Sequence, residues 1–555
     1  MTSPSWEART VHPTKTQQHP WLPIVAVSLS DHVSIVERTG EVIPLDDLPK
    51  RVVGEPSSLW VCAGAAELVG QLDVVFDSDP AWQYRVTPVK REVFSVRSAA
   101  TGRKRQTTGT VVAYFGFRRS KNHTQTKAKG HWHYPLDPAV FLPDVMNSHH
   151  VYDLLAWAQD VREFCQEHGL AVKPTAGGIA GQLLRHPRFY PEARRKVPRA
   201  TNGRARAVLP GNHYELRAST SGVTAGWYLD MHSAHHNCAV DLLFPDANAL
   251  LARGHYRVTT EPTDTTIPDT PSWAPRGSAK YDCILKRAHG MLLLRLSSPL
   301  LPASRWPLPY LRAGTFRAWV FTNELPTLHE FGVSVDAVDA AWISFGTDRG
   351  LNRYAQWALA ELATATPERL DWLKPTLLAT YGILASRPRV TEYGYKRADR
   401  GTPRLYPAGR HTLSARAYLS EKEQEVPTCN VIHRGMIEAE TRKRSLDLAR
   451  WLTTLGHNVL CVYADAVIVE QGPPLPLLPA PWGIKTPLSR LRFLHPNAFH
   501  SREMTRLPGV PKESAARVRL VHEIMQPKGT LPDPVPTEWL ALTEAEKAAR
   551  LGWGE

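Results

Sequence analysis

Two aspartates interrupt apolar segments that otherwise have the pattern of buried strands. Asp230 lies near the end of WYLDM (227–231), and Asp465 lies inside NVLCVYADAVIVE (458–470). A charged side chain in an apolar strand is unfavourable unless it is paired or binds a cation. For either acid alone, a strand-end turn or a salt bridge is the favoured interpretation. Two such strands in one chain nevertheless require a fold that gives both acids a partner.

The length of the chain predicts more than one core. At 555 residues it exceeds an ordinary single domain, so we expect two or three packed units. The hydrophobic fraction of 43% is enough to fill those cores and argues against global disorder.

The charge balance indicates a polyanionic partner. Lys and Arg total 67 against 53 acidic residues, a formal net charge of +14. Cations that neutralise phosphates release counterions, which favours binding to nucleic acid. A soluble protein that is merely basic is the alternative, and charge alone does not separate the two.

Cysteine usage and hydropathy predict a cytoplasmic protein with no membrane partner. The six cysteines lie far apart without a C-x-x-C pair, which argues against a disulfide framework or a thiolate zinc site. The first residues, MTSPSWEARTVHPTKTQQHPW, lack the apolar stretch of a signal peptide, and no apolar run approaches membrane length.

The N-terminal part has the pattern of a separate unit. Residues 1–20 are polar and expected to be disordered, and the runs IVAVSLS and SLWVCAG that follow are typical of strands. Residues 151–170 show helical spacing of apolar positions. The segment 191–210 begins with PEARRKVPRATNGRAR, a composition typical of a linker.

The C-terminal part alternates strands and helices. Residues 325–385 are predicted to be largely helical with a break at Pro367, and a second long helix is predicted over 431–455. The stretch 386–428 between them is basic and rich in turns. The acid Asp465 falls in a predicted apolar hairpin.

Three short segments resemble the motifs of family-B DNA polymerases, in the family's order. The stretch 230–236, DMHSAHH, is similar to D-x-x-S-L-Y-P. The stretch 374–382, KPTLLATYG, is similar to K-x-x-x-N-S-x-Y-G, and YADAV (463–467) is similar to D-T-D-S-V. Each motif alone is weak, but the three in order are a fairly strong signal. The compact phage and linear-plasmid enzymes primed by a terminal protein fit best.

The resemblance implies an α+β multidomain fold. It predicts an RNase H-like, exonuclease-like domain at 21–190 and a right-hand polymerase, with palm and fingers at 211–485 and a thumb with a C-terminal segment at 486–555. The basic stretch 386–428 would be the insert that encircles the template. The residues expected to bind DNA are Gly211, Arg387, Lys396, Arg397 and Lys485.

The resemblance also implies the chemistry. Asp230 and Asp465 would bind two Mg²⁺ ions, with Mn²⁺ as a substitute, and drive the addition of deoxynucleotides to a primer 3′-hydroxyl in phage DNA replication. Lys374 would contact the incoming triphosphate and neutralise charge on the leaving group. The expected partners are primer–template DNA, dNTPs and a terminal protein primer, bound by a monomer in the host cytoplasm.

Further residues would form the nucleotide site. Ser233 would approach the triphosphate, and Arg369 would be a second phosphate contact. Tyr381 would stack near the nascent base pair, with Gly382 allowing close packing. His235 stands where the family has the Tyr that excludes the ribose 2′-hydroxyl, so we expect weak discrimination against ribonucleotides.

Three other positions depart from the family's pattern. Leu378 replaces the Asn of the second motif, and Tyr463 stands where the third motif has its first Asp. The lysine–tyrosine pair expected later is not evident, and Lys485 and NAFHS (497–501) are the nearest substitutes. Because both metal-binding acids are kept, we expect a divergent but active enzyme.

The N-terminal unit lacks the proofreading acids. That activity needs a D-x-E on the first strand, and VAVSLSDHV (25–33) offers none. Asp144 could match one acid, and Asp77 and Asp79 are a stray pair. We therefore expect a degenerate domain that holds single strand without 3′–5′ cleavage.

Two other function classes compete with a polymerase. His232, His235 and His236 with Asp230 could form a zinc or iron hydrolase site, with His131 and His133 as further ligands. A catalytically silent nucleic-acid-binding relative would explain the basic excess, but not the presence of both acids and Lys374.

Overall fold

The computed structural model describes the side chains of residues 24–44, 150–170, 176–190, 202–209, 224–250, 271–299, 308–386 and 428–507, with short gaps, and only the backbone of several further strands. The chain forms two compact units, Met1–His186 with Ala360–Thr380 and Pro187–Leu359 with Tyr381–Glu555. Both mix helices and sheets, in agreement with the predicted α+β class at that coarse level. The finer domain boundaries stay predictions.

A six-stranded sheet organises the first unit. Its order is β3-β2-β1-β4-β9-β8, with bounds Glu41–Pro44, Val33–Val36, Ile24–Ser28, Leu59–Cys62, Ala139–Phe141 and Val112–Ala113. Strands β1, β4 and β9 run parallel, whereas β2 and β3 continue from β1 as an antiparallel meander. The strands predicted in IVAVSLS and SLWVCAG are confirmed as β1 and β4.

Helix α4 (Val151–Glu167) packs on this sheet through Leu154 and Ala158 against Ile24 and Ala26. It ends before Gly169, whose φ of 62° lets the chain leave the helix, so the helix predicted at 151–170 is confirmed. The unit also contains α5 (Ala176–Leu183) and a three-stranded sheet of β5 (Tyr84–Lys90), β6 (Val93–Ser98) and β7 (Arg103–Thr108).

A seven-stranded antiparallel sheet organises the second unit. Its order is β10-β23-β24-β11-β25-β26-β27, with bounds Tyr214–Leu216, Val459–Tyr463, Ala466–Glu470, Thr224–Met231, Trp482–His495, Ala498–His500 and Thr505–Arg506. The hairpin predicted around Asp465 is confirmed as β23 and β24. Both strands are almost completely buried, which explains their continuous apolar sequence.

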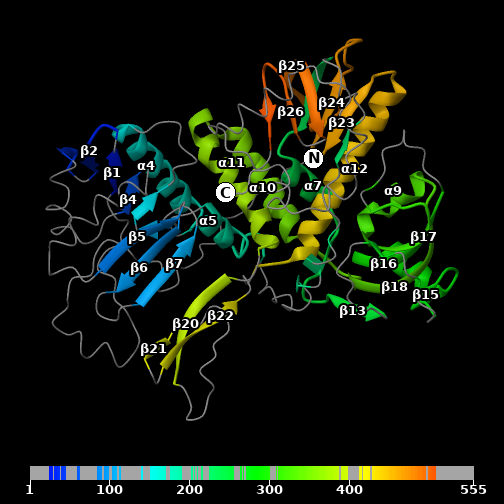
Figure 1. Cartoon of the computed structure of the whole chain (residues 1–555), viewed down its shortest axis with the longest axis horizontal. Helices are drawn as coiled ribbons and strands as arrows, with labels where there is room; N and C mark the ends of the chain where they lie inside the picture. The colour runs from blue at the N-terminus through cyan, green and yellow to red at the C-terminus, as the bar shows by residue number, and fades with distance from the viewer. Residues whose placement is uncertain are drawn as a thin grey trace, which may run out of the picture. The chain divides into compact units, whose positions relative to one another are not determined.

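Helix α12 (Val431–Thr454) runs beside this sheet and beside the short helix α7 (Ala234–Asp241), as Figure 1 shows. The Asn430 side chain accepts a hydrogen bond from the His433 N–H and so caps the first turn. Gly456, with a φ of 85°, follows the last turn. The helix predicted at 431–455 is therefore confirmed as α12. It could be predicted because the signals for its two ends are present in the sequence.

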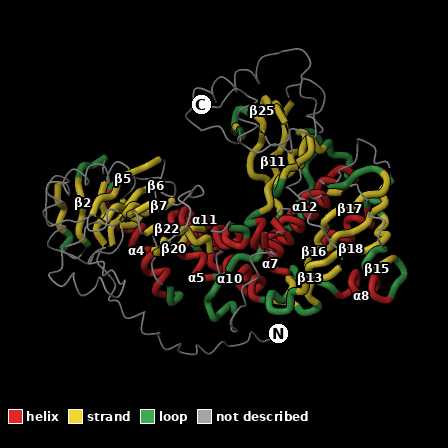
Figure 2. The backbone as a smooth tube through the Cα atoms, turned by 60° about the horizontal axis from the view of Figure 1, so that its bottom comes forward, coloured by secondary structure: helices red, strands yellow, loops and turns green. Residues whose placement is uncertain are grey.

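A second sheet in this unit contains β18, a strand in a segment that was predicted to be largely helical. Its path is β13-β18-β16-β17-β14, with β15 also paired to β18, and β16, β17 and β18 run side by side in Figure 2. The bounds are Leu251–Gly254, Ser334–Ser344, His289–Ser298, Gly314–Phe321, Thr263–Asp264 and Ala274–Pro275.

The prediction that residues 325–385 are largely helical is wrong for β18. Short helices η2 (Thr322–Glu324) and α9 (Leu325–Glu330) precede this strand, and α10 (Gly350–Thr364) and α11 (Pro367–Leu384) follow it. The alanines of SVDAVDAAWIS favour a helix locally, but pairing with β16 on one side and β13 on the other determines the structure. Trp342 of β18 stacks on Trp319 of β17, with ring centroids 4.4 Å apart.

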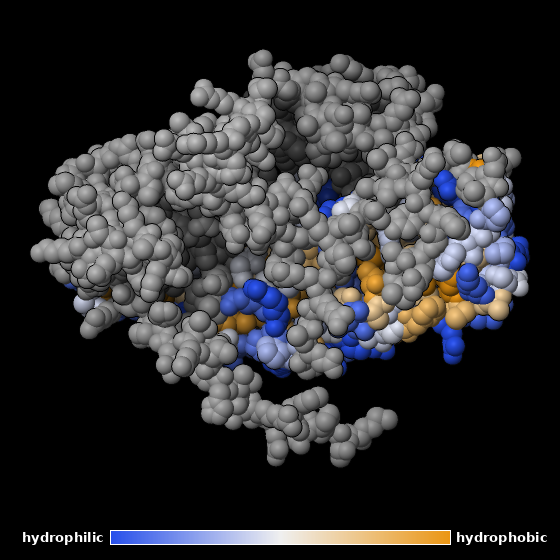
Figure 3. All heavy atoms as spheres, turned by 90° about the horizontal axis from the view of Figure 1, so that it is seen from below, coloured by the Kyte–Doolittle hydropathy of each residue, from blue (hydrophilic) through white to orange (hydrophobic). Residues whose placement is uncertain are grey.

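The remaining elements are short. They are α8 (Ala279–Arg287), the pair β12 (Phe244–Pro245) and β19 (Thr347–Asp348), and the sheet of β20 (Arg389–Arg397), β21 (Thr412–Ser414) and β22 (Ala417–Gln424). In the parts of the chain that the structure describes, no helix has the length and apolar character to cross a membrane. Figure 3 shows a face on which both hydrophilic and hydrophobic described side chains reach the surface.

Candidate active site

Strand pairing brings the two aspartates of the apolar segments together. Asp230 on β11 lies opposite Ala466, the first residue of β24, so Asp465 is the next residue beyond that pair. The Met231 N–H donates to the Asp465 carbonyl at 3.0 Å, which fixes the turn against the end of β11. Residues that are 235 positions apart in the chain therefore belong to one corner of the sheet.

The turn that carries Asp465 is tight. Tyr463 pairs with Ala466, which leaves only Ala464 and Asp465 between β23 and β24. Ala464 has a φ of 46°, as two-residue hairpins require at their first turn position. A non-glycine residue in this conformation is strained, and such strain is often found where a functional side chain must be held in place.

The electrostatics of the pair suit a divalent cation. Burial raises the pKa of the Asp465 carboxyl above its usual range, and the negative charge of Asp230 raises it further. The positive charges of Lys485 and Arg506 act in the opposite direction. Two carboxylates that repel each other in a partly buried corner have the donor type that Mg²⁺ prefers, and a cation between them would relieve the repulsion.

Lys485 forms an ion pair with Asp230. Its Nζ lies 3.1 Å from Asp230 Oδ2 and 5.4 Å from the centre of the Tyr228 ring. Gly483 lies opposite Asp230 on β25, and a Cβ there would come within 2.3 Å of His232 Nε2. The sequence indicated Lys485 as a DNA-binding residue and as the nearest substitute for the expected lysine, whereas its ion pair with Asp230 has no signal in the sequence.

Tyr463 stands where the third sequence motif has its first Asp, and its side chain makes aromatic contacts. Its hydroxyl is hydrogen bonded to that of Tyr228, and the Arg506 guanidinium lies 4.7 Å from the centre of its ring. Phe499 packs against both tyrosines. Burial raises the pKa of Tyr228 to about 12 and that of Tyr463 further still, so both phenols are neutral. Where the sequence motif led us to look for a further acid, position 463 therefore carries a neutral phenol.

Helix α7 begins directly after β11 and positions Ser233 and His235. Ser233 is the N-cap with a φ of 45°, and its side chain makes no capping hydrogen bond. The His235 ring stacks on Tyr381, with centroids 5.6 Å apart and planes 24° apart. Burial, together with the charges of Arg434 and His236, lowers the pKa of His235 to about 3. The imidazole is therefore neutral at physiological pH.

Tyr381 and Arg434 complete this cluster. The Tyr381 ring is buried and also contacts His236 edge-on, at 5.0 Å between centroids. Arg434 of α12 is held by Glu438 one turn later, at 2.8 Å. Sequence reasoning missed Arg434, because an i, i+4 pair with Glu is the ordinary pattern of a solvated helix face.

Lys374 and Arg369 lie on the part of α11 that belongs to the first compact unit. Lys374 is exposed, and its predicted contact with a triphosphate stays a prediction. Arg369 lies 3.6 Å from Asp160 and 3.5 Å from Glu167 of α4, with its guanidinium 5.5 Å from the Phe164 ring. A phosphate contact by Arg369 would have to replace these interactions.

Gly382 is exposed near the end of α11, and a Cβ placed there would meet no atom within 4 Å. The protein's own packing therefore does not require a glycine at this position, and the predicted close packing near the nascent base pair stays a prediction. Leu378, which replaces the Asn of the second motif, is partly buried on the same helix.

Several predicted residues lie outside the described part. Gly211 and Arg387 are among them, and only the backbone of Lys396 and Arg397 on β20 is described. The acids weighed for an exonuclease site are also outside the described residues: Asp77, Asp79 and Asp144. Their roles stay predictions.

The histidine-cluster hydrolase finds no support. Among the described residues, no group of three or more His, Cys, Asp or Glu side chains is arranged to hold a metal. Although α7 starts directly after β11, His236 is fully buried while His232 is exposed. His131 and His133 lie outside the described residues.

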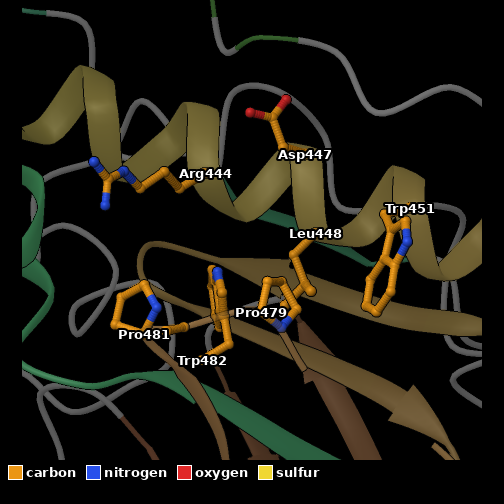
Figure 4. A pocket seen from close by; sticks show the side chains of 8 residues that line it. Arg444, Asp447, Leu448, Trp451, Pro479, Pro481 and Trp482 are labelled. Atoms are coloured by element: carbon orange, nitrogen blue, oxygen red, sulfur yellow. The ribbon is translucent and has the colours of Figure 1, made fainter. Parts of the chain in front are cut away.

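A groove of about 340 Å³ lies beside the acid corner. Leu448 and Trp451 of α12 form one wall, and Pro479 to Trp482 form the other, as Figure 4 shows. Trp482 pairs with Met231, the residue after Asp230, and the Pro481 carbonyl accepts a hydrogen bond from the His232 N–H. The groove thus adjoins the strand end that carries the aspartate.

Comparisons with known proteins identify the fold. No protein family model and no curated protein match the sequence. Among solved structures, phi29 DNA polymerase complexed with primer-template DNA and incoming nucleotide substrates matches with a TM-score of 0.52 and 12% identity, over 90% of this chain and 94% of that chain. The same polymerase complexed with single-stranded DNA matches with a TM-score of 0.50 and 11% identity, over the same shares. At such low identity the likeness is one of fold.

Proposed function

We propose that this chain is a template-directed DNA polymerase that adds deoxynucleotides to a primer 3′-hydroxyl. The observation that carries the proposal is the meeting of Asp230 and Asp465 at the β11–β24 edge, where strand register and a strained turn hold them together. The fold likeness supports it, because the phi29 structures contain primer–template DNA and nucleotide substrates. The net charge of +14 fits a nucleic-acid partner.

Each acid has a defined part in this proposal. Asp230 and Asp465 would hold two Mg²⁺ ions, or Mn²⁺ in their place. Bound there, the ions would lower the pKa of the primer hydroxyl and neutralise charge on the leaving pyrophosphate. Because Mg²⁺ commonly combines one or two protein carboxylates with phosphate oxygens, we propose that substrate phosphates complete the coordination.

The nucleotide would be held by the cluster around α7 and α11. The half-buried His235 ring, backed by the buried ring of Tyr381, would form a rigid neutral surface suited to the sugar and the nascent base pair. Ser233 would approach the triphosphate, and Lys374 would contact it as a point charge. Gly382, which has open space beside it, would face the substrate.

The finer assignment follows the sequence motifs. We propose a divergent family-B enzyme of the compact protein-primed kind, acting as a monomer in phage DNA replication in the host cytoplasm with a terminal protein as primer. DNA would be bound by Lys485, by the basic residues around β20 and by Gly211.

The first unit would hold DNA without 3′–5′ cleavage. Strand β1 carries no acid, and the acid that follows it, Asp31, serves the start of α4. Its carboxylate accepts a hydrogen bond from the Val151 N–H at 3.1 Å and lies 3.1 Å from His150 Nδ1. Measured degradation of a labelled 3′ end that is abolished by Asp144→Ala would contradict this part of the proposal.

A primer-extension assay tests the proposal. Wild type with Mg²⁺, a primed template and dNTPs should extend the primer, and Asp465→Ala should abolish extension while DNA binding persists. Asp282→Asn, a change at an exposed acid on α8, is the matched control and should leave extension intact. Wild-type protein that binds the primed template but never extends it would instead establish the silent relative.

A further inference from the structure

Lys485 is directed at Asp230 by an irregularity in the sheet. Strand β25 pairs Leu229 with Ile484 but Tyr228 with Thr486, which leaves Lys485 as the extra residue of a β-bulge. Bulges reorient a side chain at one point of a strand. Here the ammonium lies 3.1 Å from Asp230 Oδ2 and above the ring of Tyr228.

The charges explain what this contact does. Two neighbouring carboxylates repel each other, and a cation beside one of them reduces the repulsion. The ion pair is open to solvent, since the Lys485 side chain is 51% exposed and that of Asp230 22%. Pairs of this kind are weak, so the ammonium can be exchanged for a stronger cation at little cost.

We propose that Lys485 is an internal counter-cation, which holds the Asp230 carboxylate in the metal-free protein and leaves it when a divalent cation binds. The inference rests on the proposed function of the acid pair as a metal site. The ammonium and the metal ion compete for the same carboxylate oxygen, so Lys485 lowers the metal affinity of the site. In return, its charge offsets part of the repulsion between the two acids before substrate arrives.

Binding of Mn²⁺ alone tests the competition without any catalytic readout. Electron paramagnetic resonance gives the free Mn²⁺ concentration and hence the dissociation constant. Lys485→Met should bind Mn²⁺ roughly two- to fivefold more tightly than wild type, which is the factor expected when one exposed ion pair no longer competes. Arg506→Met is the matched control, because Arg506 is a second cation near the pair and lies over the Tyr463 ring. An equal gain in both variants would show a general charge effect and overturn the inference.

Chemical labelling of the wild-type chain provides an independent measurement that needs no variant to fold. An amine-reactive reagent followed by mass spectrometry should modify Lys485 faster with Mn²⁺ than without it. Lys280 on α8, whose Nζ lies 5.1 Å from the centre of the Trp273 ring, should react at the same rate in both conditions. Unchanged Lys485 labelling at saturating Mn²⁺ would refute the counter-cation. If Mn²⁺ does not bind wild type more tightly than Asp465→Asn, the proposed metal site fails as well.

Discussion

The imidazole of His235 lies nearly parallel to the ring of Tyr381, with centroids 5.6 Å apart and planes 24° apart. The histidine comes from the helix that follows the Asp230 strand, and the tyrosine comes from a motif about 150 residues later. The contact joins two of the three motifs in one packed cluster. This contact favours a neutral imidazole, because a protonated ring would be partly desolvated and would lie near the Arg434 charge.

Acid should therefore destabilise the fold through His235. The pKa of this group is about 3 in the folded chain and about 6.5 in the unfolded chain, so the unfolded chain binds the proton first. Stability is then complete above pH 6.5 and falls as the pH drops toward 3, by at most about 1.4 kcal/mol per pH unit. Thermal unfolding of wild type and His235→Phe between pH 4 and 8 measures this. The variant should show a shallower loss on the acid side, and identical slopes would contradict a lowered pKa at His235.

The same position should govern sugar selection. His235→Tyr would place a longer ring and a hydroxyl beside Tyr381, on the surface proposed to face the sugar. We expect incorporation of ribonucleotides relative to deoxynucleotides to fall by roughly tenfold or more, as steric changes in a binding pocket commonly produce. Single-nucleotide extension with each substrate gives the ratio of kcat/KM values. A ratio equal to that of wild type would remove His235 from the sugar site.

The sequence predicted the elements that carry the acids better than the contacts between them. The helix before Gly456 and the hairpin around Asp465 have clear end signals and unbroken apolar runs. Strand β18 was missed, because pairing with sheet neighbours outweighs the helical tendency of its alanines. Pattern reasoning did not find the Lys485 ion pair, since it depends on a bulge whose register no local pattern encodes.

Replacing the Asp465 carboxylate by a neutral amide should abolish activity without lowering the stability of the fold. Because burial and the Asp230 charge raise its pKa, the ionised carboxylate destabilises the fold at neutral pH. Asp465→Asn should therefore leave stability unchanged or raise it by up to about 2 kcal/mol. Primer extension should fall by roughly a thousandfold or more, since several kcal/mol of charge stabilisation are lost. The stability gain should vanish in acid, where the wild-type carboxyl is itself protonated; a variant that is clearly less stable at pH 7 would contradict this account.

Two helical glycines should respond oppositely to alanine. At Gly435 of α12 a Cβ would come within 2.1 Å of Phe321 and 2.6 Å of Leu209, so Gly435→Ala should cost about 1–3 kcal/mol. At Gly382 the space is open, so Gly382→Ala should be neutral or stabilising by up to about 1 kcal/mol. Urea denaturation compares the pair directly. If Gly382 faces the substrate, Gly382→Ala will also weaken primer extension, although the fold is no less stable.

A buried ion pair joins α12 to η2, the short helix that follows β17 of the second sheet. Arg442 Nη2 lies 2.8 Å from Glu324 Oε1, and the two side chains are 1% and 0% exposed. Glu324→Ala leaves a buried guanidinium without its main counter-charge, so we expect a loss of about 3–5 kcal/mol in the free energy of unfolding. The exposed pair between Arg450 of α12 and Glu330 of α9 is the matched control, and Glu330→Ala should cost only about 0–1 kcal/mol.

A double variant tests whether the Arg442–Glu324 ion pair stabilises the fold, or whether it only prevents the cost of an unpaired buried charge. Glu324→Met with Arg442→Met removes both charges and keeps similar volume. Its stability should lie within about 1 kcal/mol of wild type or above it, because two charges no longer have to be desolvated. Amide hydrogen exchange of β17 and β18, the strands that carry the stacked Trp319 and Trp342, reports unfolding of this region. A double variant as unstable as Glu324→Ala would show that the ion pair itself, rather than the cost of breaking it, holds α12 in place.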